Sequence, residues 1–284
     1  MAKTQDLRRR ISSIRNTRQL TKAMKTVSAA KLRRAQDAML AARPYADQMQ
    51  KVLKSLASRA NPEAHPLLAR HGDQRVRAVV ITSDRGLCGS FNVNICRAAT
   101  AFFEEYRERD LELLTVGRKG RDYFRRRNYT MGRDWEDVLR TVGYTTAVDI
   151  AQFLIEAYVK DDVDTVFIVY NEFKSAMQQQ PVVEQLLPIE RLDLEAGESE
   201  DYIYEPDAAS LFNSLLPKHV EFQIYRALRE SVAAEHAARM TAMDAATRNA
   251  GELIDKLTLH MNRVRQASIT TEIIEVVSGA EALG

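Results

Sequence analysis

The chain has 284 residues, of which 45% are hydrophobic, so it can bury a sizeable core. No run approaches the roughly 18 uncharged apolar residues that would span a bilayer, and two cysteines are too few for a disulfide framework. We therefore expect a protein of a reducing compartment that has no direct membrane insertion.

The formal net charge of +2 conceals an uneven distribution. Residues 1–60 carry 15 Lys and Arg against three acids, a net charge of +12, whereas residues 61–217 carry 18 against 27. Residues 218–284 are close to neutral, with 8 against 9. A strongly basic helix needs an acidic neighbour, which is nucleic acid, anionic lipid or an acidic protein surface.

The N-terminal segment is predicted to form one long helix. No glycine occurs before Gly72, and apolar residues recur at helical spacing. The apolar stripe shifts between Ile14 and Leu20, so no single heptad repeat runs through it. Pro44 conflicts with a continuous helix because an internal proline kinks or ends one. Pro62 marks a firmer end.

The middle of the chain alternates short apolar runs with helical stretches, which predicts a parallel, doubly wound sheet. The predicted strands are 76–82, 111–116 and 164–170. The predicted helices are 93–107, 118–127 and 147–159. We interpret residues 174–205 as an irregular or hairpin connection.

A second long helical region is predicted from Pro206, with an early break at Pro217. Nine of the 24 residues at 227–250 are alanine, which predicts a thin shaft that makes most of its contacts with another molecule. After Arg265 no Lys or Arg follows, and the last turns are apolar nearly all round. Such a helix end is normally buried, so a partner is expected to cover it.

The residues indicate no active site, no cofactor and no metal. The turn at Gly86–Gly89 follows a strand and precedes a helix, but it reads G-L-C-G and the chain has no Walker motif, so a structural turn is favoured over a nucleotide site. Cys88 lacks a recognisable histidine base and is better explained as a buried or interface thiol. No spacing of His, Cys, Asp and Glu suggests a metal site.

Several motifs occur in order along the chain: 14–36 (IRNTRQLTKAMKTVSAAKLRRAQ), 83–92 (SDRGLCGSFN), 202–207 (YIYEPD), 235–254 (EHAARMTAMDAATRNAGELI) and 265–280 (RQASITTEIIEVVSGA). Together they closely resemble the gamma subunit of the F-type ATP synthase, over essentially the whole chain. The resemblance implies an α/β fold with long helices. Its parts would be an N-terminal coiled-coil helix (1–60), a central Rossmann-like α/β domain (61–206) and a C-terminal coiled-coil helix (207–284), the two helices being antiparallel.

The resemblance also implies a function, that of a central rotor shaft. In this family the coiled coil threads a hexamer of three alpha and three beta subunits, and the central domain meets the epsilon subunit and the ring of c subunits. Proton flow turns the ring and the shaft, so that each beta subunit passes in sequence through conformations that make ATP. ATP-driven proton pumping is the reverse.

Certain residues correspond to the family's contact positions. Arg265 and Gln266 match a catch on the beta subunits, and the basic N-terminal helix suits acidic loops of beta. The residues implied at the alpha/beta hexamer are Arg8, Arg9, Met24, Lys25, Cys88, Arg239, Arg265, Gln266, Ile273 and Val277. Those implied at epsilon and the c ring are Tyr202, Tyr204 and Glu205.

Two other functions are weighed against this one. The first is a basic coiled-coil protein that binds nucleic acid, which the broken heptad pattern disfavours. The second is a nucleotide-binding enzyme in the central domain, which the missing Walker motif disfavours. The regulatory insert of chloroplast gamma subunits and a transit peptide are not apparent, so we expect a bacterial protein, peripheral on the cytoplasmic face of the plasma membrane.

Overall fold

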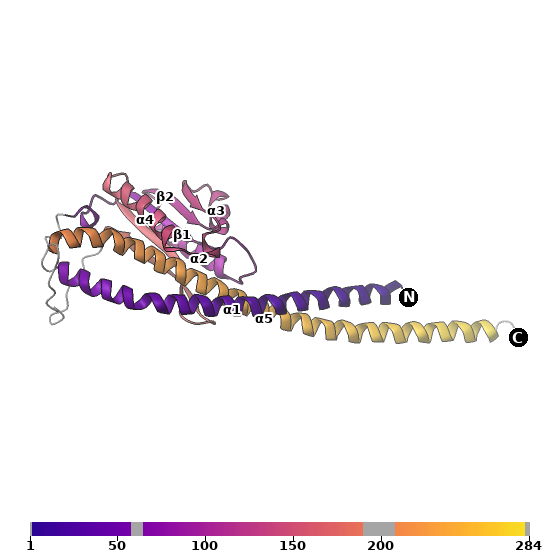
Figure 1. Ribbon diagram of the computed structural model, residues 1–284. Helices are drawn as coiled ribbons and strands as arrows, with labels where there is room; N and C mark the ends of the chain where they lie inside the picture. The colour runs from indigo at the N-terminus through magenta and orange to yellow at the C-terminus, as the bar shows by residue number, and fades with distance from the viewer. Residues whose placement is uncertain (1, 58–64, 190–207, 282–284) are drawn as a thin grey trace. The chain divides into compact units, whose positions relative to one another are not determined.

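A computed structural model of the chain describes residues 2–57, 65–189 and 208–281. The chain forms two compact units: a helical unit of residues 1–28 and 239–284, and a sheet unit of residues 29–238. The long helices α1 (Ala2–Ala57) and α5 (Ala208–Glu281) each contribute to both units (Figure 1). The predicted domain boundaries, at residues 60 and 206, lie outside the described residues and stay predictions.

The sheet unit contains five strands in the order β3-β2-β1-β4-β5. The first four are parallel, and β5 pairs antiparallel with β4. The strands are β1 (Arg75–Ile81), β2 (Asp110–Val116), β3 (Met131–Trp135), β4 (Thr165–Phe173) and β5 (Gln179–Leu187). The three predicted strands are confirmed, and the hairpin interpretation of the following segment is confirmed for β5. Sequence reasoning missed β3, whose short stretch MGRDW has no β-branched residue.

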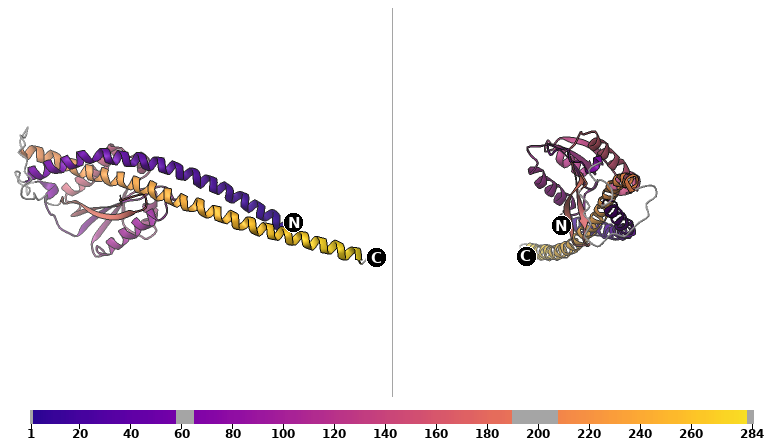
Figure 2. Two further views of the ribbon diagram at one scale, coloured as in Figure 1. Left: turned by 90° about the horizontal axis from the view of Figure 1, so that it is seen from below. Right: turned by 90° about the vertical axis from the view of Figure 1, so that its left-hand side faces the viewer.

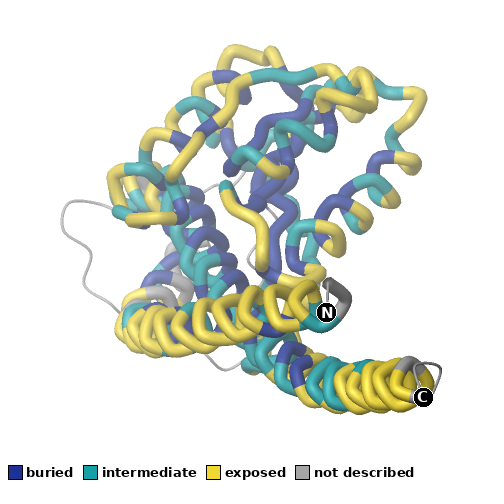
Figure 3. The backbone as a smooth tube through the Cα atoms, turned by 90° about the vertical axis from the view of Figure 1, so that its right-hand side faces the viewer, coloured by how far each residue is buried: buried dark blue, intermediate teal, exposed yellow. Residues whose placement is uncertain are grey.

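Helices cover both faces of this sheet, as a doubly wound fold requires. On one face, α2 (Phe91–Glu104) and α3 (Arg118–Arg125) bury a core around Ala78 and Val80 of β1. On the other, α4 (Tyr144–Val159) and parts of α1 and α5 bury a second core around Val79 and Ile81. Successive residues of β1 therefore face opposite cores, and the central strands β1 and β4 are buried along most of their length, in the interior of the sheet unit (Figure 3). Short 3₁₀ helices lie at Pro66–Leu68 and Val138–Arg140.

Both prolines that predicted an interruption lie inside continuous helices, so the predicted break at Pro217 is wrong. Proline cannot donate to the carbonyl four residues earlier, which for Pro217 is that of Asn213. The imidazole of His65 donates a hydrogen bond to that carbonyl, so the lost backbone bond is replaced. Pro44 is exposed, which leaves its turn of α1 open to water.

Candidate subunit-interaction surfaces

In the helical unit, α1 and α5 pair in opposite directions. Lys25 Nζ lies 2.5 Å from Asp244 Oδ1, and the hydroxyls of Thr21 and Thr247 lie 2.8 Å apart. The earlier residue on α1, Thr21, meets the later residue on α5, Thr247, which confirms the antiparallel arrangement of the two helices. The hydrogen bond from Lys25 lowers the pKa of the Asp244 carboxyl.

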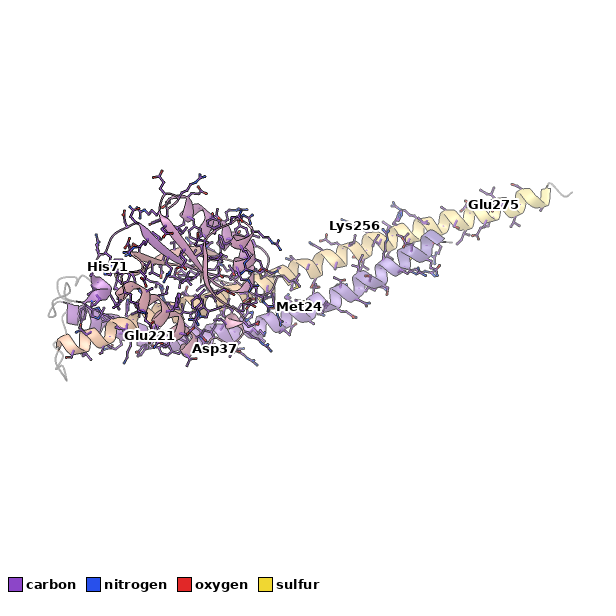
Figure 4. The ribbon with its side chains drawn as sticks, turned by 90° about the horizontal axis from the view of Figure 1, so that it is seen from above. Met24, Asp37, His71, Glu221, Lys256 and Glu275 are labelled. Atoms are coloured by element: carbon purple, nitrogen blue, oxygen red, sulfur yellow. The ribbon has the colours of Figure 1, made fainter. Side chains whose placement is uncertain are left out.

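The seam between these two helices is narrow. On α1 it buries Ile11 (5% exposed), Thr21 and Ser28, and on α5 it buries Met243, Ala250 and Ile254. Half of this set is small or polar, so the pair is held by close approach and hydrogen bonds as much as by apolar packing. The remaining faces of both helices point outward. Met24 and Lys256 lie along the paired stretch in Figure 4.

The last turns of α5 expose five large apolar side chains. In the helical unit, α5 continues past the N-terminal end of α1 (Figure 2), and Glu275 lies on this extension (Figure 4). Its apolar side chains are 48–72% exposed: Ile269, Ile273, Ile274, Val276 and Val277. No described residue of the chain buries them. The chain's own core therefore does not cover this helix end, as the sequence predicted.

The other predicted contact residues differ in how far they are buried. Arg8 and Arg9 are exposed on α1, and Arg265 and Gln266 are exposed on α5. Met24, Lys25 and Arg239 are half-buried, and Lys25 is engaged by Asp244. Tyr202, Tyr204 and Glu205 lie outside the described residues.

Two apolar residues on α1 are exposed. Leu20, which belongs to the apolar stripe of the predicted helix, is 62% exposed, and Val27 is 55% exposed. They are seven residues apart and therefore share one face of the helix. That face is turned away from the seam, whose α1 residues Thr21 and Ser28 each follow directly in sequence. The i, i+7 spacing was visible, but nothing in the sequence showed which of the two faces meets α5.

The turn that joins β1 to α2 is held by its own side chains. Asn92 Oδ1 accepts the backbone N–H of Ser83 at 2.9 Å, and Asn92 Nδ2 donates to Ser83 Oγ at 2.7 Å and to Cys88 Sγ at 3.2 Å. Cys88 is 2% exposed, so its thiol is buried in this chain. The turn instead presents Leu87, which is 65% exposed and has a left-handed backbone (φ 64°).

This turn lies where open α/β sheets usually bind ligands. The strand order reverses at β1, between its neighbours β2 and β4, and ligands bind at such a point beside the carboxyl ends of the strands. Here the space is filled by the chain itself. Cys88 and Phe91 pack against Ala234 and Ala238 of α5, with Phe173 at the end of β4 beside them. This packing supports the interpretation of the G-L-C-G sequence as a structural turn.

The same packing corrects the expectation that the alanine-rich stretch contacts mainly another molecule. Five of its alanines are at most 7% exposed within the sheet unit: Ala227, Ala233, Ala234, Ala237 and Ala238. Alanine is needed there because α5 lies close to the turn and the sheet. No helix among the described residues is long and apolar enough to cross a membrane.

Comparison with known proteins gives the family. A family model described as ATP synthase matches residues 3–283. The chain is 52% identical to the ATP synthase gamma chain of Anaeromyxobacter sp. (strain Fw109-5) over 289 residues, which cover 100% of both chains. The chain belongs to the ATP synthase gamma-chain family. The gamma chain of Pelotomaculum thermopropionicum is 51% identical, again over the full length of both chains. The resemblance seen in the sequence motifs is thus confirmed.

Solved structures agree with this membership. A chain in the central stalk and c-ring structure of the Tetrahymena thermophila mitochondrial ATP synthase is 28% identical, with a TM-score of 0.62. The match covers 80% of this chain and 99% of that one. A chain of the Euglena gracilis mitochondrial ATP synthase has a TM-score of 0.70 over 99% of this chain and 95% of that one. At 19% identity this second match shows the shared fold alone.

Proposed function

We propose that this gamma chain is the central rotor shaft of a bacterial F-type ATP synthase. Rotation of the proton-driven membrane ring would turn it, and it would pass the motion to the catalytic subunits. The observation that carries the proposal is the apolar end of α5. Five exposed Ile and Val side chains gathered at one helix end mark a surface that a partner covers, and apolar contacts carry few directional bonds that would resist turning.

Coupling requires that the shaft contact its partners unequally. A protein shifts the conformational equilibrium of its partner only by as much as it binds one conformation better than another. The two helices of the helical unit offer different chemistry, because α1 carries exposed arginines such as Arg8 and Arg9 whereas α5 exposes apolar side chains at Leu253 and Leu259. A beta subunit would therefore meet a different surface at each angle of rotation. Exposed ion pairs contribute only about 0–1 kcal/mol each, so they can form and break at every step.

Individual contacts follow from this arrangement. Arg265 and Gln266 would form a catch on the beta subunits, since both side chains are exposed just before the apolar end. Ile273 and Val277 would sit in an apolar sleeve of the alpha/beta hexamer. Tyr202, Tyr204 and Glu205 would meet epsilon and the c ring. For Cys88 the structure favours an indirect role, because the buried thiol shapes the turn that presents Leu87.

The proposed assembly has three alpha and three beta subunits around one copy of this chain, with epsilon and the c ring at its foot. It would lie peripherally on the cytoplasmic face of the bacterial membrane. The chain itself would be non-catalytic. That view is supported by the packing of Ala234 and Ala238 into the position where related sheets hold a ligand.

Reconstitution with alpha, beta and the membrane sector tests the proposal. We expect one copy of this chain per three nucleotide-hydrolysing subunits. The double variant Arg265→Ala, Gln266→Leu should fold and assemble but lose coupled ATP synthesis. Lys256→Ala, a change at an exposed position nine residues earlier on the same helix, serves as the control. Full ATP synthesis by the double variant would refute the proposed catch. An equal number of copies of this chain and of the beta subunit would refute the proposed role as a single central shaft.

A further inference from the structure

A group of charged side chains lies between α5 and the β4–β5 hairpin of the sheet unit, and all but one of them are partly exposed. Arg226 of α5 reaches Glu184 of β5, with Nη2 2.5 Å from Oε2. Tyr170 of β4 donates to the other oxygen of Glu184 at 2.9 Å. Just beyond β4, Lys174 Nζ lies 2.6 Å from Oε1 of Glu172. Each of these two carboxylates therefore has its own cation.

Glu230 is the third carboxylate, and it has no cation of its own. Its side chain is only 12% exposed, and its nearest cation is Arg226, with Nη1 3.8 Å from Oε1. That guanidinium is already engaged by Glu184. The backbone N–H of Phe173 donates to the Glu230 carboxyl, but Oε2 is buried and has no hydrogen-bond partner among the described residues.

Counting charges shows why this matters. Three carboxylates (Glu172, Glu184, Glu230) share two cations (Arg226, Lys174), so one negative charge is uncompensated. A buried, unpaired charge is costly, and a carboxyl group in this position is normally neutralised by taking up a proton. A protonated Glu230 would remove the excess charge and keep its hydrogen bond from Phe173.

We propose that Glu230 is a proton-binding group that links the seating of α5 on the β4–β5 hairpin to pH. When α5 is seated, the carboxyl is enclosed and takes a proton from water. When α5 lifts at this point, water reaches Oε2 and the proton is released. Proton binding and seating then favour each other, so acid tightens the contact and alkali loosens it.

The pKa directions agree with this geometry. Burial raises the pKa of Glu230, and the neighbouring Glu172 and Glu184 act in the same direction against Arg226. The folded state therefore binds this proton more strongly than the unfolded state. Its stabilising effect is full below the ordinary glutamate pKa and is lost as the pH rises through the raised value. His219, seven residues before Arg226, has its pKa lowered to about 4 by burial and so adds no charge at neutral pH.

Thermal unfolding of the full chain at pH 5.5 and pH 8 tests the proposal, because Glu230→Gln mimics the protonated carboxyl. We expect the melting temperature of the variant, relative to wild type, to rise between pH 5.5 and pH 8. Between the ordinary glutamate pKa and the raised Glu230 pKa, each pH unit should shift the folding equilibrium about tenfold in favour of the variant, and above the raised value the difference should stay constant. Contributions common to both proteins, including those of His219, cancel in this comparison.

The matched control is Glu252→Gln, which makes the same change at an exposed glutamate of α5 outside this group. Its melting temperature relative to wild type should be the same at both pH values. A melting-temperature difference between Glu230→Gln and wild type that is the same at both pH values would overturn the proposal. A second measurement does not depend on folding of the variant: the carboxyl ¹³C resonance of Glu230 in wild type should titrate above those of exposed glutamates, and titration in their usual range would also overturn it. Neither readout depends on the proposed rotary function.

Discussion

Replacing Ala234 with leucine should disrupt the contact between α5 and the turn after β1. Ala234 is fully buried, and its neighbours Cys88 and Phe91 are 2% and 3% exposed, so no space remains for three further carbon atoms. Overpacking of this kind costs about 1–3 kcal/mol. For a unit of this size, a loss of about 2 kcal/mol lowers the melting temperature by about 4–8 °C.

The assay is thermal unfolding of the isolated chain, together with amide exchange in the turn. Ala30→Leu is the matched control, because Ala30 lies on α1 with its side chain exposed and leucine is nearly as good a helix former as alanine. We expect faster exchange in the turn of Ala234→Leu and near wild-type behaviour of the control. Equal melting temperatures for the two variants would refute the argument that the alanines are required by close packing.

Three further predictions concern separate parts of the chain. Asp164→Ala removes the acceptor for the backbone N–H groups of Gln74 and Arg75 and for the Arg75 guanidinium, and should cost about 3 kcal/mol in urea unfolding. The hydrogen bond from Arg75 lowers the pKa of Asp164. The stabilisation that Asp164 provides is therefore complete above the ordinary aspartate pKa and should be lost as the pH falls below that value. An Asp164→Ala variant with the same acid unfolding transition as wild type would contradict this prediction. His65→Ala leaves the Asn213 carbonyl without its hydrogen bond and should lower the free energy of unfolding by about 1–2 kcal/mol, measured by calorimetry. Adding Pro217→Ala should reduce this loss, because alanine supplies a backbone N–H for the same carbonyl. Ile273→Glu should leave the free energy of unfolding of the isolated chain within about 0.5 kcal/mol of wild type but weaken assembly with the hexamer. Tight binding of the hexamer by this variant would show that the exposed side chain meets no apolar sleeve.

The sequence was a good guide wherever local pattern and packing agree. The β-branched run of β1 and the glycine-free terminal segments predicted a buried strand and long helices, because propensity and burial act there in the same direction. Pro217 was misread because its compensation comes from His65, more than a hundred residues away in the chain. A pattern within one helix cannot reveal such a partner.

The candidate surfaces were predictable to a similar extent. The apolar end of α5 was evident, because five large apolar residues including Ile273 recur within its last turns and no core in the chain was available for them. The outward position of Leu20 and Val27 was not, since a helical stripe does not tell which face meets a neighbour. The burial of Cys88 under α5 also depends on a contact distant in sequence. The partner assignments come from the family resemblance alone. The pattern of apolar and charged residues predicted where the exposed surfaces lie.

The measurement that tests the central proposal most directly is observation of single reconstituted complexes with the hexamer fixed to a surface and a bead attached to the sheet unit of this chain. On addition of ATP, the account predicts continuous rotation of the bead in one direction with three pauses per turn, one for each catalytic subunit. A bead that stays still while the same complexes hydrolyse ATP at full rate would contradict it.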